Sequence, residues 1–585
     1  MKPLNYHLFF GVLLWGSFFV KAQEEGADDL GTQEVTVVKS YSPSLKDVFK
    51  IRSLPAAEDT LVYKKQKIEY TFETIPVVST FIPNKASPLK LNRQVRTTGH
   101  NSYVSGGIGN NAFLKFDISS MVPLDRIQSI GFKMLRTKVG SIENTLLNSE
   151  QNRTTLDLLH QYKQNKMRVD SDLRFDRQGH NFFGLYNFDW NNIPSFRAEV
   201  IDPTQNLNYL SIRSNWQWYD AVFRKVNFNT HFTTDSFDSS EHIVKINTQV
   251  LLPFLRNYIE LIPEISLINT DFTRGYFSDE SLSYQNGLGA LDFNFLSIGK
   301  KLKLKLGASG FYHFANSDEK AALYAYPNTE ISYNFNNSKI IPFLKYEGGF
   351  HLNSFTSFSQ NNPYVSPTLS IRPTQENNHF TIGLNAFPGS GFSFNINTQY
   401  SELDDFPIFK RLPYDKNNGD MAYRLSNAYQ VIYDHLQKMG IVTDISIRFS
   451  EYNKVSLNIN YFKYRRASGE KAFNLPETTI DMSANFRLAK KIFIQTVGKY
   501  MGKRDSVKFL IVQPGEEEEG GFESTETTGS VFSISTYLTW KINSAWDLFY
   551  ENKMLLGDQT SQWAYYQNQD QLHLGGIRYK FDINL

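Results

Sequence analysis

The sequence predicts a large antiparallel transmembrane β-barrel, and three features of the chain indicate this fold class. The first is the C-terminal segment, residues 577–585, where apolar and polar residues alternate up to the last residue. The second is an N-terminal segment with the order of a secretory signal, and the third is a period of two along most of the 585 residues. Successive side chains of a strand point to opposite faces, so this pattern gives strands with two different faces.

The C-terminal segment has one face suited to lipid and one suited to water. Its apolar residues occupy alternate positions, and they are Ile577, Tyr579, Phe581, Ile583 and Leu585. Arg578, Lys580 and Asp582 lie between them and are predicted to face the lumen. The segment looks like the closing strand of a bacterial outer-membrane barrel, whose apolar stripe is an insertion signal. This resemblance implies contact with outer-membrane lipids and with the barrel-assembly machinery.

The first 22 residues are predicted to be a signal peptide. Met1, Lys2 and His7 form a basic start, and an apolar run of 13 residues, 8–20, precedes a cut ahead of Gln23. The run is too short for an ordinary spanning helix, and a single N-terminal membrane anchor is the alternative. The chain has no Cys, which excludes lipoprotein acylation, disulfides, zinc–thiolate sites and cysteine nucleophiles.

The composition agrees with strands that cross a membrane. Aromatic residues make up 15% of the chain, and charged residues only 21%. Barrel strands expose apolar side chains at alternate positions and add aromatic girdles, which keeps the mean hydropathy low. The net charge of +2 gives no reason to expect nucleic acid or an acidic partner.

Segments of period two recur from about residue 100 onward. Clear examples are 302–309, 441–449, 454–461 and 532–540, and each is close to the roughly 9–11 residues of a tilted crossing strand. Counting such segments gives roughly 20, and closure with both ends in the periplasm favours an even number, so we predict about 16–22 strands. A soluble β-sandwich or solenoid also alternates, but it leaves the signal peptide and the terminal stripe unexplained.

The predicted connections alternate between short and long, as in barrels with short periplasmic turns and longer external loops. Short turns rich in Gly, Asn, Pro and Ser are predicted at 163–166, 299–300, 336–338, 388–391 and 543–544. Longer connections are predicted at 139–153, 191–203, 403–425, 504–527 and 557–570. Because the last strand is predicted to run towards the periplasm, the turn at 543–544 is assigned to the periplasm and 504–527 to the exterior.

Two of these external loops carry residues suited to interactions. Residues 404–411, Asp-Asp-Phe-Pro-Ile-Phe-Lys-Arg, form either a partner or ligand surface or, as we favour, an ordinary solvated loop tip. Trp563, Tyr565 and Tyr566 lie close together in a second loop. We interpret these three aromatics as part of a girdle at the membrane interface rather than as a ligand surface.

Patterns for catalysis and metal binding are sparse. The sequence contains no Gly-rich phosphate loop in a strand–helix context, no paired histidine motif and no nucleophile elbow. Residues 106–109, Gly-Gly-Ile-Gly, are interpreted as a close backbone approach or a bend within a strand or turn. The acidic run 516–519 has ligands that suit calcium, but its flanking glycines favour a solvated loop. We therefore predict no enzyme activity, no cofactor and no metal site.

Residues 23–98 separate the signal peptide from the predicted barrel, residues 99–585. The segments 34–55 and 127–133, together with the terminal strand, resemble TonB-dependent-receptor-like barrel proteins. In that family a short N-terminal box pairs as a strand with the energy-transducing protein TonB, and the similar residues here are Glu34, Val35, Thr36, Val37 and Val38. Strand addition needs only an extended backbone, so a packed linker strand is the alternative.

The N-terminal region departs from the family in its length. It has only about 75 residues, whereas a compact domain usually has roughly 100–150, so a full plug domain is not expected. The region is predicted to be a periplasmic leader or a reduced plug-like segment. This departure puts energised uptake in doubt.

The resemblance implies solute uptake or passage across the outer membrane of a Gram-negative bacterium. The alternative is a non-transporting barrel that serves as a subunit or scaffold of a larger assembly, with other outer-membrane and periplasmic proteins as partners. A barrel enzyme would need Ser, His and acidic groups converging at one rim, and no motif in the sequence marks such a site.

Overall fold

Alternating residues form long strands throughout the part of the chain that can be described. The computed structural model describes residues 99–186, 198–219, 221–316, 321–335, 339–389, 391–415, 421–509, 523–557 and 562–584. In these ranges 22 strands form one antiparallel sheet, and two further strands form a separate hairpin. No helix in these ranges is long and apolar enough to cross a membrane.

The strands of the first half of the sheet are β1 Ser102–Gly109, β2 Leu114–Pro123, β3 Gln128–Val139, β4 Gln151–Lys163, β5 Met167–Asn181, β6 Thr204–Trp218, β7 Phe223–Thr234, β8 Ser240–Phe254, β9 Asn257–Phe272, β10 Leu282–Ile298 and β11 Leu302–Ala315. Those of the second half are β12 Ala322–Tyr333, β13 Ile340–His351, β14 Thr374–Gly389, β15 Phe392–Arg411, β16 Tyr429–Arg448, β17 Lys454–Arg466, β18 Thr478–Ala489, β19 Ile492–Met501, β22 Val531–Lys541, β23 Trp546–Gly557 and β24 Gln571–Phe581. The separate hairpin is β20 Arg504–Phe509 with β21 Glu523–Thr528, and the helical elements are α2 Phe355–Asn361 and the 3-10 turn Ala422–Arg424.

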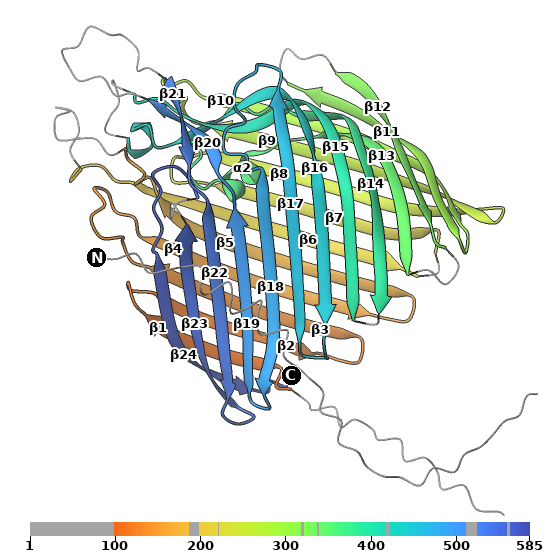
Figure 1. The fold of residues 1–585 in the computed structure, drawn as a ribbon, viewed down its shortest axis with the longest axis horizontal. Coiled ribbons are helices and arrows are strands. Elements are labelled where there is room, and N and C mark those ends of the chain that lie inside the picture. Colours follow the sequence, from red (N-terminus) through yellow and green to blue (C-terminus); the bar gives the residue numbers. More distant parts are fainter. Residues whose placement is uncertain are drawn as a thin grey trace, which may run out of the picture. The chain divides into compact units, whose positions relative to one another are not determined.

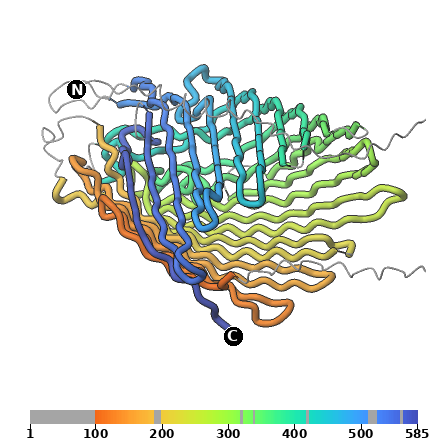
Figure 2. The backbone as a smooth tube through the Cα atoms, turned by 60° about the horizontal axis from the view of Figure 1, so that its bottom comes forward, coloured from red at the N-terminus to blue at the C-terminus, as the bar shows by residue number. Residues whose placement is uncertain are grey.

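The sheet closes on itself, which confirms the predicted fold class and places the strand number at the upper end of the predicted range. Each strand pairs with its neighbours along the chain, except that β19 pairs with β22 across the β20–β21 hairpin. The first strand, β1, also pairs with the last, β24, over eight residue pairs from Ser102–Phe581 to Gly109–Leu574. In Figure 2 the orange start and the blue end of the barrel accordingly lie side by side. Closure leaves no strand edge open to lipid.

The glycines of β1 allow the two ends of the barrel to approach closely at this seam. A Cβ added to Gly109 would lie 1.8 Å from the backbone oxygen of His573 on β24, and one added to Gly107 would lie 2.4 Å from the Leu574 side chain. A Cβ added to Gly106, in contrast, would have no atom within 4 Å. The interpretation of residues 106–109 as a close backbone approach is therefore confirmed for Gly109, whereas Gly107 makes room for the Leu574 side chain.

We expect Gly109→Ala to weaken the closing seam, because the backbone of β24 would have to move away from the new methyl group. Overpacking of this kind costs about 1–3 kcal/mol. The measurement is the temperature at which the purified barrel loses its compact, fast-migrating form on SDS gels. Gly106→Ala is the matched control and should leave that temperature unchanged. An equal transition for Gly109→Ala and the natural chain would contradict this account of the seam.

The two faces of the strands differ as the sequence predicts. On β24, Ile577 and Tyr579 are exposed on the outer face. On the inner face, Arg578 donates to the Tyr537 hydroxyl at 2.8 Å, and Lys580 donates to Asp547 at 2.7 Å. Leu585 lies outside the described residues, and β24 ends at Phe581 rather than at the end of the chain. Asp582 therefore follows the strand, where it accepts from the Asn101 amide at 3.0 Å instead of lining the lumen.

The connections alternate in length around the barrel, as predicted. Short turns join β4 to β5, β10 to β11, and β22 to β23 at the predicted positions. The connections β3–β4, β5–β6 and β23–β24 at the other end are long. The turn predicted at 336–338 lies outside the described residues. We call the two ends the short-turn end and the long-loop end.

Two of the predicted external loops contain strands instead. Residues 403–411 belong to β15, which continues to Arg411, so the prediction of a solvated loop tip or ligand surface there is wrong. β15 changes register between Leu403 and Phe406, and Asp405 has a positive φ of 50° there. The apolar–polar alternation of the strand is therefore interrupted at the two acids, and the sequence resembles a loop. The predicted loop 504–527 contains the β20–β21 hairpin, in which Arg504–Phe509 pairs with Glu523–Thr528.

Candidate functional site: the lumen and its loop cap

The inner wall of the barrel is polar and carries cross-strand ion pairs. Arg153 on β4 donates from two nitrogens to Asp176 on β5 at 2.9 and 2.7 Å. Arg213 on β6 pairs with Asp172 on β5 at 2.9 Å. Paired charges and amides satisfy one another on such a wall while remaining accessible to water and to a polar solute.

A recess of about 550 Å³ lies in the inner wall between β8 and β14. Its acidic and basic lining residues are Lys245, Glu264, Asp292, Glu347, His351 and Glu376. Lys245 pairs with Glu264 at 2.6 Å, whereas the Asp292 carboxylate makes no side-chain hydrogen bond or ion pair with any described residue. Carboxylates outnumber cations in this lining, so the recess favours positively charged or hydrogen-bond-donating groups.

Amide side chains form a second feature of the inner wall, on β14 and β15. Asn395 donates to Asn385 at 2.6 Å, Asn397 donates to Asn395 at 2.8 Å, and Gln399 donates to Asn397 at 2.9 Å. Each amide offers both donors and acceptors. This ladder gives the wall an uncharged hydrogen-bonding track along the strand direction.

Connections from around the long-loop end meet in one hydrophobic cluster, which we call the cap core. Its buried members are Leu147, Phe182, Phe183, Tyr186, Ile201, Tyr276, Tyr364, Leu412, Ala422, Tyr423, Leu425, Ala428, Tyr429, Trp563 and Tyr566. They come from the connections β3–β4, β5–β6, β9–β10, β13–β14, β15–β16 and β23–β24, and from the start of β16. Since these connections leave the barrel at points spread around its rim, their common core lies across the opening.

Aromatic contacts join the loops of the cap core directly. Tyr364 of the β13–β14 connection stacks on Tyr566 of the β23–β24 connection with ring centroids 3.5 Å apart. Phe183 of the β5–β6 connection meets the same Tyr566 ring edge-on at 5.1 Å. Such pairs add to the stabilisation that burial itself provides.

One buried arginine joins three of these connections. The side chain of Arg411, at the end of β15, is 0% exposed. Its guanidinium donates to the carbonyl oxygens of Gly184 at 2.6 Å and Ala564 at 3.2 Å, and also to that of Ser426. The rings of Tyr186 and Tyr565 lie 4.3 and 4.6 Å from it. Among the described residues the partners of this guanidinium are thus carbonyl oxygens and ring faces, which suit its planar set of donors and its charge.

Buried tyrosine hydroxyls supply further links between the connections. Tyr276 donates to the Pro413 carbonyl at 3.0 Å, and Tyr566 donates to the Asn427 carbonyl at 2.7 Å. Burial raises the pKa of both hydroxyls well above the ordinary value, so they stay protonated and continue to donate.

Helix α2 attaches the β13–β14 connection to the inner wall below the cap core. The Glu241 side chain on β8 is buried, and its two oxygens accept from the backbone amides of Phe355 and Thr356, each at 2.7 Å. The Thr270 hydroxyl on β9 donates to the same carboxylate at 2.7 Å. Phe355 and Phe358 pack with buried side chains of β6, β9 and β16. Figure 1 shows α2 at the same end of the barrel as β20 and β21.

The β20–β21 hairpin covers the outer part of the cap beside β15. Val507 and Phe509 of β20 are buried with Ile408 of β15 and Phe473 of the β17–β18 connection. Lys410 pairs with Glu523 of β21 at 2.8 Å. The segment 404–411 therefore helps to fix the cap rather than to bind a partner at a loop tip.

The predictions for the other site residues have different outcomes. The interpretation of Trp563, Tyr565 and Tyr566 as an interface girdle is wrong, because Trp563 and Tyr566 are buried in the cap core. The TonB-box-like residues 34–38 and the acidic run 516–519 lie outside the described residues. The sequence did not show that Arg411 and Glu241 join the loops to one another and to the wall, since their partners are far away in the chain and are mostly backbone groups.

Comparison with known proteins identifies the fold. No protein-family model matches the sequence, and no curated protein matches it either. The structure is similar to the ferripyoverdine receptor of the outer membrane of Pseudomonas aeruginosa, with a TM-score of 0.57 and 9% identity over 83% of this chain and 72% of that one.

Two further solved structures are similar to this chain. The FrpB iron transporter from Neisseria meningitidis matches with a TM-score of 0.57 and 9% identity over 83% of this chain and 81% of that one. The ferric-catecholate import receptor Fiu from Escherichia coli K12 matches with a TM-score of 0.55 and 8% identity over 83% and 82%. The chain therefore has the barrel fold of TonB-dependent receptors, as the resemblance in the sequence implies.

Proposed function

We propose that this chain is a receptor-like barrel of the bacterial outer membrane, through which a polar solute passes when the loop cap opens. The observation that carries the proposal is the polar lumen with an acidic recess, which lies below loops packed across its long-loop end. The similar structures include an iron transporter and an import receptor. Residues 23–98 are proposed to be a periplasmic leader or reduced plug, and Glu34 to Val38 a strand that pairs with TonB.

The acidic recess suggests the chemical class of the solute. Its carboxylates favour a solute that carries a positive charge or several hydrogen-bond donors. Asp292 is the carboxylate best placed to meet such a group, because no described side chain is already bonded to it.

Charge selectivity of the lumen tests this assignment. In a barrel whose cap has been opened by Arg411→Met, we expect cations to pass in preference to anions, and Asp292→Asn to lower the cation-to-anion permeability ratio roughly twofold. The ratio follows from the reversal potential across a planar bilayer with a KCl gradient. Asp170→Asn, in an exposed ion pair with Arg168 on β5, is the matched control and should change the ratio less. Equal ratios for all three barrels would remove the recess from the proposed solute path.

The cap core itself favours a second candidate function. A barrel whose loops are joined through a buried arginine and stacked aromatics could serve as a non-transporting subunit or scaffold of a larger outer-membrane assembly. Purification from native membranes in mild detergent separates the two functions. A stoichiometric partner, together with an absence of conductance after the cap is opened, would favour the scaffold function and refute the passage of a solute through the lumen.

A further inference from the structure

The outer surface of β3 to β5 carries two arginines whose side chains have no partner among the described residues, at the edge of the apolar surface nearest the long-loop end. In the strand register Phe116, Arg136, Thr154 and Arg177 lie directly opposite one another on β2, β3, β4 and β5. Directly opposed residues share a face, and Phe116 is exposed on the outer face. Arg136 and Arg177 are both exposed, and their side chains make no hydrogen bond or ion pair with any described residue.

The two arginines lie near the long-loop end of their strands, at the depth expected for lipid headgroups. The next outer-face positions towards the short-turn end are Met134, Leu156 and Phe175, and all are apolar. On β3 only three residues follow Arg136 before the β3–β4 connection begins. Under the proposed outer-membrane location this is the boundary between the acyl chains and the headgroups of the external leaflet.

The spacing of the two arginines suits one anionic group. They are separated by a single strand, so their backbones lie about 9–10 Å apart, twice the distance between neighbouring strands. Thr154, on the intervening strand, places a small side chain with a hydroxyl between them. Two guanidinium groups and a hydroxyl around such a space form a typical phosphate-binding arrangement.

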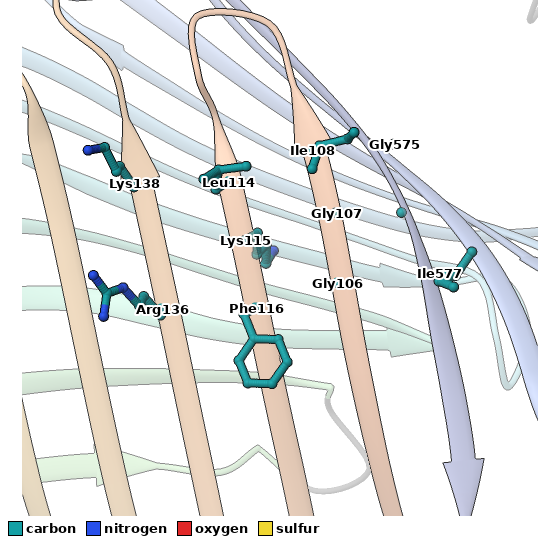
Figure 3. Close-up of a pocket in the computed structure, with 11 residues that line it drawn as sticks. Gly106, Gly107, Ile108, Leu114, Lys115, Phe116, Arg136, Lys138, Gly575 and Ile577 are labelled. Carbon is teal, nitrogen blue, oxygen red and sulfur yellow. The ribbon is translucent and has the colours of Figure 1, made fainter.

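An apolar groove lies beside the two arginines on the same outer surface. Its volume is about 520 Å³, and its floor includes Gly106 of β1 and Gly575 of β24, where an added Cβ would meet no atom within 4 Å. Figure 3 shows the groove with the side chains at its sides, which are Ile108, Leu114, Phe116 and Ile577, and with Arg136 and Lys138 on the neighbouring strand. Lys138 pairs with Glu150 at 2.8 Å and is therefore the less available cation.

We propose that this surface binds one phosphorylated glycolipid of the outer leaflet, of the lipid A type. A phosphate lies between Arg136 and Arg177 beside Thr154, and the part of an acyl chain next to the headgroup packs in the groove over Gly106 and Gly575. An acylated anion matches both halves of the surface, since the groove accepts hydrocarbon while the arginines require negative charge. The inference rests on the proposed outer-membrane location, but it is independent of whether the lumen conducts.

Lipid binding to the purified full-length chain in detergent tests the proposal by native mass spectrometry. The probes are monophosphorylated lipid A, the same lipid after its phosphate is removed, and phosphatidylglycerol. The natural chain should bind the phosphorylated lipid A about tenfold more tightly than either of the other two. In Arg136→Gln/Arg177→Gln this preference should disappear. Arg126→Gln/Arg256→Gln, which changes two exposed arginines in turns at the short-turn end, is the matched control and should keep it.

A second variant tests the contribution of the groove to binding separately from that of the arginines. Gly106→Leu should weaken binding of both forms of lipid A about threefold and leave the phosphate preference intact. The substituted arginines are exposed and a Cβ at Gly106 would meet no atom within 4 Å, so each barrel should keep its heat-dependent gel mobility. Retention of the preference in Arg136→Gln/Arg177→Gln would overturn the proposal, as would equal binding of phosphatidylglycerol and lipid A by the natural chain. Unchanged binding in Gly106→Leu would overturn the assignment of the groove.

Discussion

Replacing Arg411 with methionine is expected to release the connections of the cap core from one another while the barrel wall stays closed. The substitution leaves the carbonyl groups of Gly184, Ser426 and Ala564 buried without their donor. Breaking a buried charged network of this kind costs about 3–5 kcal/mol. Opening of the cap should therefore become more frequent by roughly a hundredfold or more.

Hydrogen exchange of the loop amides measures this opening. Amides in the 562–566 segment and around Ser426 should exchange much faster in Arg411→Met, and those in the middle of the barrel strands should not change. In Arg411→Lys these amides should exchange at rates between those of the natural chain and of Arg411→Met, because an ammonium group cannot reproduce the planar set of donors. Arg126→Met, at an exposed turn, controls for the loss of an arginine elsewhere. Full protection of the loops in Arg411→Met would refute the role given to this residue.

Replacing Glu241 with leucine should detach α2 from the inner wall. The substitution removes the acceptor for the amides of Phe355 and Thr356 and for the Thr270 hydroxyl. The loss of these charge-assisted hydrogen bonds in a buried site should destabilise the attachment of α2 by about 2–4 kcal/mol. Chymotrypsin should then cut after Phe355 or Phe358, both of which are buried in the natural chain.

The extent of cleavage distinguishes this role of Glu241 from a general effect of losing a carboxylate. Glu241→Gln keeps one acceptor oxygen and should be cut more slowly than Glu241→Leu. Glu143→Leu, in the exposed β3–β4 connection, should be as resistant as the natural chain. Equal resistance of Glu241→Leu would show that α2 is held by apolar packing alone.

The outer wall of the barrel could be predicted from the sequence because the apolar–polar alternation within each strand shows which residues face outwards and which face inwards. The alternation at residues 577–581 gives the exposed Ile577 and Tyr579 and the inward Arg578 and Lys580 without any knowledge of other strands. The even strand number follows from closure with both ends on one side, and the alternation of short and long connections follows from the spacing of the segments along the chain. These features depend on neighbours in the chain, where a period of two is directly visible.

The cap could not be predicted in the same way, because its contacts join residues that are far apart in the chain. Arg411 donates to the backbone oxygens of residues 184, 426 and 564. Every residue has such an oxygen, so the residue types at these positions do not indicate the contact. Trp563 and Tyr566 have the composition of a membrane girdle, and only their contacts with other loops place them in the cap core. The two acids at 404–405 imitate a loop, although they lie at a register change within β15.

The central claim is that the packed loops close the long-loop end of a polar lumen, which conducts when these loops separate. The most direct measurement is the planar-bilayer conductance of the chain without residues 23–98, with either Arg411 or methionine at position 411. The account predicts no steady conductance with the natural cap and discrete open-channel steps with Arg411→Met. Steady conductance with the natural cap, equal to that of Arg411→Met, would contradict it.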